Sequence, residues 1–332
     1  MPSTAATPAA RLSVAPMMDW TDRHCRSFHR GMSREVLLYT ELVTAAALVR
    51  GGALHLLDFD PAEHPVAIQL GGADPSELAR ATELALERGY AEVNLNVGCP
   101  SDRVQSGCFG AILMEQPDLV ARCVRAMIDA AGDRPVTVKC RIGVDDQEPS
   151  VVLPDFIGRL RDVGVRRMSI HARKAWLQGL SPKENRDIPP LDHDLVHGMK
   201  VRFPDMHLSV NGGIATLDEA CAHLEHMDGV MIGRAAYHDP AAILLRADSR
   251  IYGGVDPCPD RVTAALKMVP YIERHLRAGG RLGQVTRHML GLFNGLPGAR
   301  HWRRTLSEGA AKPGAGIEVL YSALDQVESA AA

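Results

Sequence analysis

Eight short apolar segments recur along this chain of 332 residues, and they limit its possible folds more than any other feature. Helical patterns separate most of them; one begins at Pro75 and repeats Leu78, Ala81 and Ala85 at helical spacing. The predicted strands are Leu12–Ala15, Val36–Thr40, Val66–Leu70, Ala91–Asn96, Val136–Cys140, Arg167–His171, Leu208–Asn211 and Gly229–Ile232. Eight strands that alternate with helices are typical of a (β/α)8 barrel, the TIM barrel.

The rest of the chain predicts two appendages to this barrel. Residues 1–10 are rich in Ala, Pro and Thr and lack the apolar core of a signal peptide, so we expect a disordered tail. Residues 11–255 contain all the predicted strands and form the expected barrel domain. Beyond Pro257 the pattern is purely helical, which predicts a small helical domain over residues 256–328.

The composition excludes several classes of protein. Hydrophobic residues make up 46% and charged residues 23% of the chain, as in soluble globular proteins, and no apolar run approaches a membrane span. The seven cysteines are odd in number and contain no Cys-x-x-Cys pair. This pattern argues against a disulfide scaffold and against a zinc site, and it favours a reducing cytoplasm.

Positive charge is concentrated in one segment of an otherwise acidic chain. Between Arg261 and Arg304 there are nine Lys or Arg residues and one acid, whereas the whole chain has a net charge of −3. A solvated helix face would produce such a segment, and so would a surface that binds a polyanion. The charge alone leaves both interpretations open.

Polar side chains stand at or just past the ends of six predicted strands, which is where TIM barrels carry their active sites. A single polar residue there is often structural, but so many from different strands predict a functional cavity. The residues are Gln69, Asn94, Asn96, Cys99, Lys139, Arg141, His171, Asn211 and Arg234.

Cys99 is the predicted catalytic residue. The strand that contains Asn94 and Asn96 breaks at Gly98-Cys99-Pro100, because proline cannot continue a strand ladder. Free cysteines are usually inert and buried, but a cysteine on a long loop after a strand is placed for chemistry. The loop ends where Pro117 predicts the start of a helix.

Two glycine-containing segments predict an anion site. Asn211-Gly212-Gly213 follows the seventh strand and Gly233-Arg234 follows the eighth, the usual phosphate position of TIM barrels. Glycine backbones let N–H groups approach the anion, and Arg234 adds a charge-assisted donor. Lys139 and His171 would share this cavity, where Lys139 could contact a flavin or form a Schiff base. The pattern leaves these two roles open.

Taken together, these motifs closely resemble those of the tRNA-dihydrouridine synthases, in particular the bacterial A-type. The resemblance covers residues from about 11 to 308. The matching segments are Ala15–Asp22, Asn94–Met114, Val138–Gly143, His171–Leu177, Leu180–Arg186, Val210–Ile214, Asp228–Arg234, His288–Phe293 and Pro297–Arg304.

The resemblance implies an FMN enzyme that reduces uridines 20 and 20a in the D-loop of tRNA, with NADPH as reductant. A hydride would pass from flavin N5 to uracil C6, and Cys99 would donate the proton to C5. By the same likeness FMN would be bound by Pro16, Met17, Met18, Gln69, Lys139, His171, Asn211, Gly212, Gly213, Gly233 and Arg234. The tRNA would be contacted by Lys183, Arg186, Arg300 and Arg303, with Asn96 a candidate donor to the uracil and Trp302 a candidate stacking platform.

Other classes of protein share parts of this pattern. An FMN-dependent dihydropyrimidine or dihydroorotate dehydrogenase would have the same barrel but would not need the basic helical segment. A Schiff-base aldolase would use Lys139 and would contain no flavin. A non-catalytic RNA-binding protein would not need the polar cavity.

Overall fold

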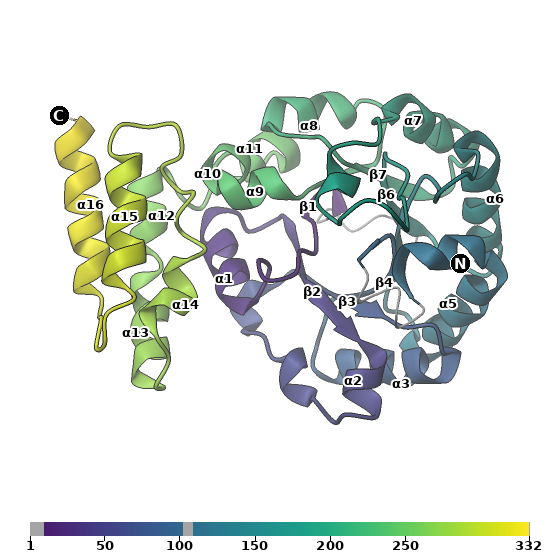
Figure 1. The fold of residues 1–332 in the computed structure, drawn as a ribbon, viewed down its shortest axis with the longest axis horizontal. Helices are drawn as coiled ribbons and strands as arrows, with labels where there is room; N and C mark the ends of the chain where they lie inside the picture. Colours follow the sequence, from purple (N-terminus) through teal and green to yellow (C-terminus); the bar gives the residue numbers. More distant parts are fainter. Residues whose placement is uncertain (1–9, 102–108, 332) are drawn as a thin grey trace.

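The computed structural model describes residues 10–101 and 109–331, and its centre is a closed barrel of eight parallel strands (Figure 1). Neighbouring strands pair in chain order, and β1 pairs with β8 to close the ring. The strands are β1 Leu12–Val14, β2 Leu37–Thr44, β3 Val66–Gly71, β4 Glu92–Val97, β5 Val136–Arg141, β6 Arg167–His171, β7 His207–Asn211 and β8 Gly229–Ile232. The predicted TIM barrel and all eight predicted strands are confirmed.

One strand is longer than the sequence predicts. We expected the second strand to end at Thr40, before the polar residue Glu41, but β2 continues to Thr44. The pairing of β2 with β3 shifts register between Tyr39 and Leu42. Such an irregularity changes which side chains point into the barrel, so a polar residue need not end the strand.

Helices surround the barrel and begin with the capping residues that the sequence supplies. They are α1 Arg23–Met32, α2 Ala45–Val49, α3 Pro75–Glu87, α5 Pro117–Ala131, α6 Pro149–Asp162, α7 His193–Arg202 and α8 Leu217–His223. Pro75 and Pro117 occupy first turns, as predicted. The Thr216 side chain accepts from the Glu219 N–H in the predicted capping box of α8.

The segment after β8 differs from the sequence-based prediction. We expected one helix from Pro240 to about Gly253, but the chain forms α9 Arg234–His238, α10 Pro240–Leu244 and α11 Ala247–Tyr252. Arg246 has non-helical backbone angles and separates the last two helices. The helical periodicity of the residues does not reveal such a break.

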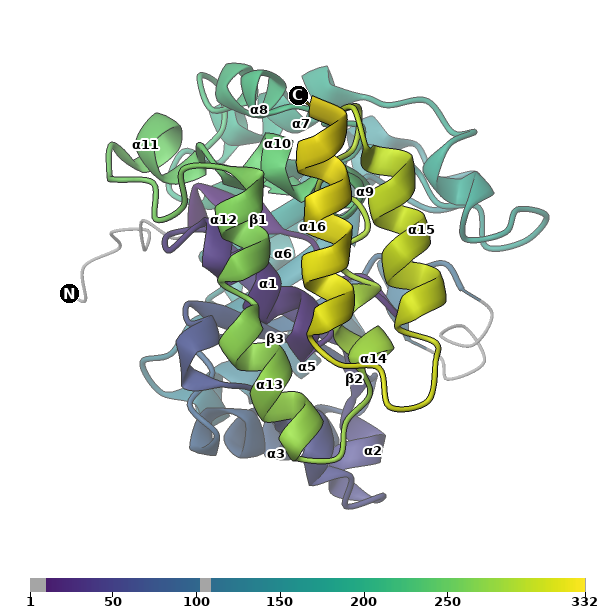
Figure 2. The same ribbon diagram turned by 90° about the vertical axis from the view of Figure 1, so that its left-hand side faces the viewer.

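Further helices follow and pack beside the barrel (Figure 2). They are α12 Arg261–Leu266, α13 Val269–Arg277, α14 Leu282–Thr286, α15 Ala299–Gly309 and α16 Glu318–Ala331. None of the helices in the described ranges is long and apolar enough to cross a lipid bilayer. Of the predicted N-terminal tail, residues 1–9 lie outside the described part of the chain, and Ala10 is buried.

A partly buried ion-pair network joins these helices to the barrel. Asp22 caps α1 by accepting from the His24 and Cys25 N–H groups, and its other oxygen accepts from Arg287 at 2.6 Å and His288 at 3.0 Å. Although burial opposes it, the hydrogen bond from His288 holds the pKa of Asp22 well below its usual range. The appended helices are therefore fixed next to the loop that follows β1.

Candidate active site

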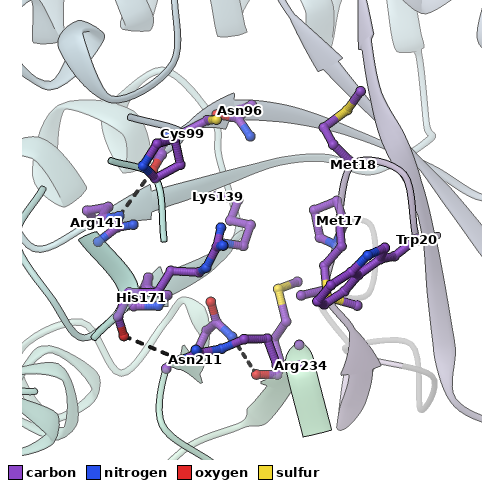
Figure 3. Close-up of a pocket in the computed structure, with 18 of the residues that line it drawn as sticks. Met17, Met18, Trp20, Asn96, Cys99, Lys139, Arg141, His171, Asn211 and Arg234 are labelled. Atoms are coloured by element: carbon purple, nitrogen blue, oxygen red, sulfur yellow. Dashed lines mark hydrogen bonds between the residues drawn. The ribbon is translucent and has the colours of Figure 1, made fainter. Parts of the chain in front are cut away.

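A cavity of about 640 Å³ opens at the C-terminal ends of the barrel strands (Figure 3). Its size is that of a site for a cofactor or small ligand. The predicted residues that line it are Pro16, Met17, Met18, Gln69, Asn96, Cys99, Lys139, Arg141, His171, Arg186, Asn211, Gly212, Gly213, Gly233 and Arg234. The sequence reasoning did not single out Trp20 and His238, which also line it.

The cavity is positively charged. Its described lining includes Lys139, Arg141, Arg186 and Arg234 and contains no aspartate or glutamate. Within the described residues, Arg234 is the one of these four that forms an ion pair, with Asp187 at 2.8 Å. Such an imbalance of charge around a concave site favours an anionic ligand.

Three glycine N–H groups at one side of this cavity are available to bind an anion, and we call them the anion cradle. The N–H groups of Gly212, Gly213 and Gly233 make no hydrogen bond within the described residues. Gly212 and Gly213 have φ angles of 109° and 77°, which favour glycine. A Cβ on Gly213 would lie only 2.4 Å from a methyl group of Leu191, so a side chain at this position would have to displace Leu191.

Lys139 and His171 lie at the centre of the cavity on neighbouring strands (Figure 3). Burial, with a contribution from the charge of Arg141, lowers the pKa of Lys139 to about 8. Burial and the charges of Arg141 and Lys139 also hold the pKa of His171 well below its usual range. His171 Nδ1 is buried and has no hydrogen-bond partner within the described residues, so it is available to a ligand.

The loop that carries Cys99 is held by two side chains. The Asn96 oxygen accepts from the N–H groups of Gly98 at 3.1 Å and Cys99 at 3.0 Å. Arg141 donates from Nε to the Gly98 carbonyl at 3.1 Å (Figure 3). The thiol of Cys99 is half-buried, and Sγ donates to Ser101 Oγ at 3.4 Å. Because the backbone of Cys99 is held by hydrogen bonds while its side chain is only half-buried, the thiol is accessible to a ligand.

A chain of hydrogen bonds runs from Asn96 into the barrel interior. Asn96 Nδ2 donates to Gln69 Oε1 at 2.8 Å, and Gln69 Nε2 donates to Asn94 Oδ1 at 2.9 Å. Asn94 Nδ2 then donates to Thr137 Oγ1 at 2.8 Å, and the Thr137 hydroxyl donates to Glu92 at 2.5 Å. The carboxylate accepts only, so every donor in the chain points the same way.

This chain corrects one prediction and adds residues that the sequence reasoning missed. Asn94 was expected in the cavity, but it is fully buried one layer below it, because Asn94 stands two residues before Asn96 on β4. Glu92 and Thr137 were not singled out. An acid between Ala91 and Val93 in an apolar strand was the available signal, and the structure pairs it with Tyr39 and Arg167.

The predicted RNA-contacting residues lie in two places. Lys183 and Arg186 are exposed on the loop between β6 and α7, and Arg186 lines the cavity. Arg300 and Arg303 are exposed on α15 and do not line it. Cys108, which we expect not to take part in the chemistry, lies outside the described residues.

The prediction that Trp302 is a stacking platform is wrong. Its side chain is fully buried, and Nε1 donates to the Met289 carbonyl at 2.9 Å. Trp302, Ala299 and Leu306 occupy the buried face of α15 and pack among the C-terminal helices. The indole therefore serves the core and cannot stack on a nucleobase.

Comparison with known proteins assigns the family. The profile of the family described as dihydrouridine synthase matches residues 13–328. The chain belongs to the dihydrouridine synthase family. Two relatives, both named tRNA-dihydrouridine(20/20a) synthase, come from Vibrio cholerae and Escherichia coli K12. The V. cholerae protein is 56% identical, over 97% of this chain and 98% of its own length. The E. coli protein is 58% identical, over 96% of this chain and 92% of its own length.

Solved structures with a similar fold are more distant in sequence than these relatives. An old yellow enzyme homologue from Zymomonas mobilis superposes with a TM-score of 0.53 at 13% identity, over 71% of this chain and 88% of that chain. Morphinone reductase gives a TM-score of 0.52 at 14% identity, over 78% and 91%. At this identity the likeness concerns the fold alone.

Proposed function

We propose that this enzyme reduces uridines 20 and 20a in the D-loop of tRNA to 5,6-dihydrouridine in the cytoplasm, with FMN as cofactor and NADPH as reductant. Membership of the dihydrouridine synthase family supports the reaction, and the printed names of the relatives support the substrate. The observation that carries the proposal is the placement of Cys99 and the glycine anion cradle in one cavity without acidic residues.

The cavity fits a flavin mononucleotide. The N–H groups of Gly212, Gly213 and Gly233 would bind its phosphate, since they are unpaired within the described residues and Arg234 stands beside them. His171, with a buried and unpartnered nitrogen, would donate or accept a further bond. Pro16, Met17 and Met18 provide an apolar wall for the rings, while Gln69, Lys139 and Asn211 provide polar contacts. When bound, the flavin supplies the hydride for uracil C6 and is reduced again by NADPH.

Cys99 would supply the proton to uracil C5. General acid catalysis needs a donor that is both held in place and accessible, and the Cys99 loop meets both conditions. Asn96 would stabilise the negative charge that develops on a carbonyl oxygen of the base. The Asn96 oxygen already accepts from two N–H groups, and one Nδ2 hydrogen is donated to Gln69. The second Nδ2 hydrogen remains for a ligand.

The RNA would lie across the barrel mouth and the C-terminal helices. Lys183 and Arg186 would contact phosphates near the cavity, and Arg300 and Arg303 would contact them on α15. These phosphate contacts would offset the free energy needed to move the uridine out of the RNA stack. The helices over residues 256–328 would then act as the RNA-binding domain.

The experiment that tests this function compares substrates. The purified protein is incubated with NADPH and either unmodified tRNA transcript, free uracil or orotate, and the products dihydrouridine, dihydrouracil and dihydroorotate are measured by mass spectrometry. We expect a flavin spectrum in the purified protein and dihydrouridine only in the tRNA. Reduction of free uracil without reduction of tRNA would instead indicate a free-base enzyme.

A further inference from the structure

Trp176 is an exposed indole at the mouth of the barrel, on the loop between β6 and α7. Its relative exposure is 37%, whereas Trp302 is fully buried. Tryptophan is strongly buried on average, because exposing its large apolar surface costs free energy. Trp176 does not itself line the cavity, but Pro182 and Arg186 of the same loop do, so an exposed tryptophan on this loop calls for a partner that covers it.

The backbone of Trp176 is held in place by one buried side chain. Asn185 Oδ1 accepts from the Trp176 N–H at 2.7 Å, and Asn185 Nδ2 donates to the Trp176 carbonyl at 2.8 Å. The same Nδ2 donates to the Leu180 carbonyl at 3.1 Å, and Asn185 is fully buried. The loop thus presents the indole from a fixed backbone, which reduces the entropy lost when a partner binds.

The same loop is tied to the active-site cavity. Arg141 Nη1 donates to the Lys174 carbonyl at 3.0 Å and to the Asn185 carbonyl at 2.9 Å. Through Nε, Arg141 also bonds the Gly98 carbonyl next to Cys99. One buried arginine therefore fixes the Trp176 loop relative to the Cys99 loop.

One cation lies over this indole, and two more are exposed on its loop. The Lys174 ammonium lies 5.3 Å from the centre of the Trp176 ring, and Lys183 and Arg186 are exposed on the same loop. The acids of the loop are engaged, because Asp187 pairs with Arg234 and Glu184 accepts from the Ser181 N–H. Basic side chains around an exposed aromatic ring are the usual surface for unpaired nucleic-acid bases.

We propose that Trp176 stacks on an unpaired base of the substrate RNA, next to the uridine that enters the cavity. The inference rests on the proposed function. When the target uridine leaves the stack, its neighbours lose a stacking surface, and the indole on the loop that borders the cavity replaces that surface. Trp176 thereby takes the role that the sequence assigned to Trp302.

The test is a double-mutant cycle, in which a protein variant and an RNA variant are combined and tRNA binding to the FMN-bound enzyme is measured. Binding of Trp176→Ala to tRNA transcripts is compared with wild type, using either the normal tRNA or transcripts with an abasic nucleotide at each neighbour of the target uridine. We expect Trp176→Ala to weaken binding of normal tRNA by roughly 5- to 150-fold, the range for one stacked base. With the correct abasic tRNA the substitution should have little further effect, because both changes remove the same contact.

Two matched variants separate stacking from loop structure. Trp176→Phe retains an aromatic face and should keep most of the affinity, and Val201→Ala, at an exposed apolar residue of α7, should behave like wild type. Equal weakening of normal and every abasic tRNA by Trp176→Ala would overturn the proposal, and so would unchanged binding. Failure of the proposed function would look different, since the wild-type protein itself would then not bind or reduce tRNA.

Discussion

The carboxamide oxygen of Asn96 accepts a hydrogen bond from the backbone N–H of Cys99 at 3.0 Å. The two residues stand at the break between β4 and its loop, so the end of the strand directly positions the cysteine. Asn96 is in turn oriented by Gln69, Asn94, Thr137 and Glu92 in the barrel interior. The position of the proposed acid therefore also depends on Asn94, Thr137 and Glu92, which do not line the cavity.

Replacement of Cys99 by alanine should separate the two halves of the reaction. Positioned acid catalysis contributes about 10²–10⁴ in rate, so Cys99→Ala should slow uridine reduction by roughly that factor. Reduction of the flavin by NADPH, followed by its absorbance in a stopped-flow instrument, should stay normal. Cys108→Ala is the control and should retain most of the activity. A fully active Cys99→Ala enzyme would refute the assignment.

Thr137→Val should disturb the same site from a distance. The substitution keeps the shape but removes the hydroxyl that accepts from Asn94, so a buried amide hydrogen loses its partner. We expect the free energy of unfolding, measured with denaturant, to fall by about 1–3 kcal/mol. Uridine reduction should slow as well, because the amide orientations behind Cys99 are no longer fixed. Thr137→Ser keeps the hydroxyl and should restore both quantities; if valine and serine behave alike, the hydrogen-bond chain has no positioning role.

The lowered pKa of Lys139 predicts how FMN affinity depends on pH. In the ligand-free protein Lys139 loses its proton near pH 8, whereas a bound anion would favour the charged form. FMN affinity should therefore be constant below about pH 8 and fall above it, by at most about tenfold per pH unit. Fluorescence titration of apoprotein with FMN measures this profile. Lys139→Met should bind FMN more weakly at pH 7, and its affinity should lack the decline; an unchanged profile would remove Lys139 from the FMN site.

The lowered pKa of Lys139 also determines how the stability of the ligand-free protein depends on pH. Between pH 8 and the ordinary lysine value of 10.5, unfolded chains carry a proton on this residue that the folded, ligand-free chain lacks. The contribution of Lys139 to the free energy of unfolding should therefore rise with pH across that window. The difference between wild type and Lys139→Met in denaturant unfolding at pH 7.5 and 9.5 isolates it. A difference that does not change with pH would contradict the lowered pKa.

Arg300 and Arg303 should control the salt dependence of tRNA binding. Both are exposed on α15 and form no ion pair within the described residues. Replacing both with glutamine should reduce the slope of log affinity against log salt by about 1.4, at about 0.7 per phosphate contact. Arg274 and Arg277 on α13 provide a matched control pair, since they already form ion pairs with Asp60 and Glu273. Replacing that pair should change the slope less, and equal changes would mean that α15 has no special role.

The barrel could be predicted from the sequence because its strands are buried on both faces. Segments such as Val66–Leu70 and Gly229–Ile232 are almost continuously apolar, which sets them apart from the helical patterns between them. The glycines after β7 and β8 were also predictable, since the fold places a phosphate site there. Local pattern and general fold rules thus account for most of the cavity lining.

The predictions that failed concern how deep a residue lies in the barrel or which way its side chain points. Alternation on β4 correctly put Asn94 and Asn96 on one face, but only the closed barrel shows that Asn94 lies a layer below the cavity. The arginines beside Trp302 suggested an RNA surface, although Leu306, four residues later, places the indole on the buried face. The links from Arg141 to two separate loops depend on long-range packing, which no local pattern encodes.

The central claim is that Cys99 and the acid-free cavity act together on a uridine of tRNA. The most direct measurement is a single turnover: enzyme with pre-reduced flavin is mixed with a tRNA transcript, and the digested RNA is analysed by mass spectrometry. We predict that a uridine at position 20 or 20a gains the mass of two hydrogens in step with flavin oxidation, and that Cys99→Ala delays both events. Flavin oxidation that leaves every tRNA uridine unchanged would contradict the account.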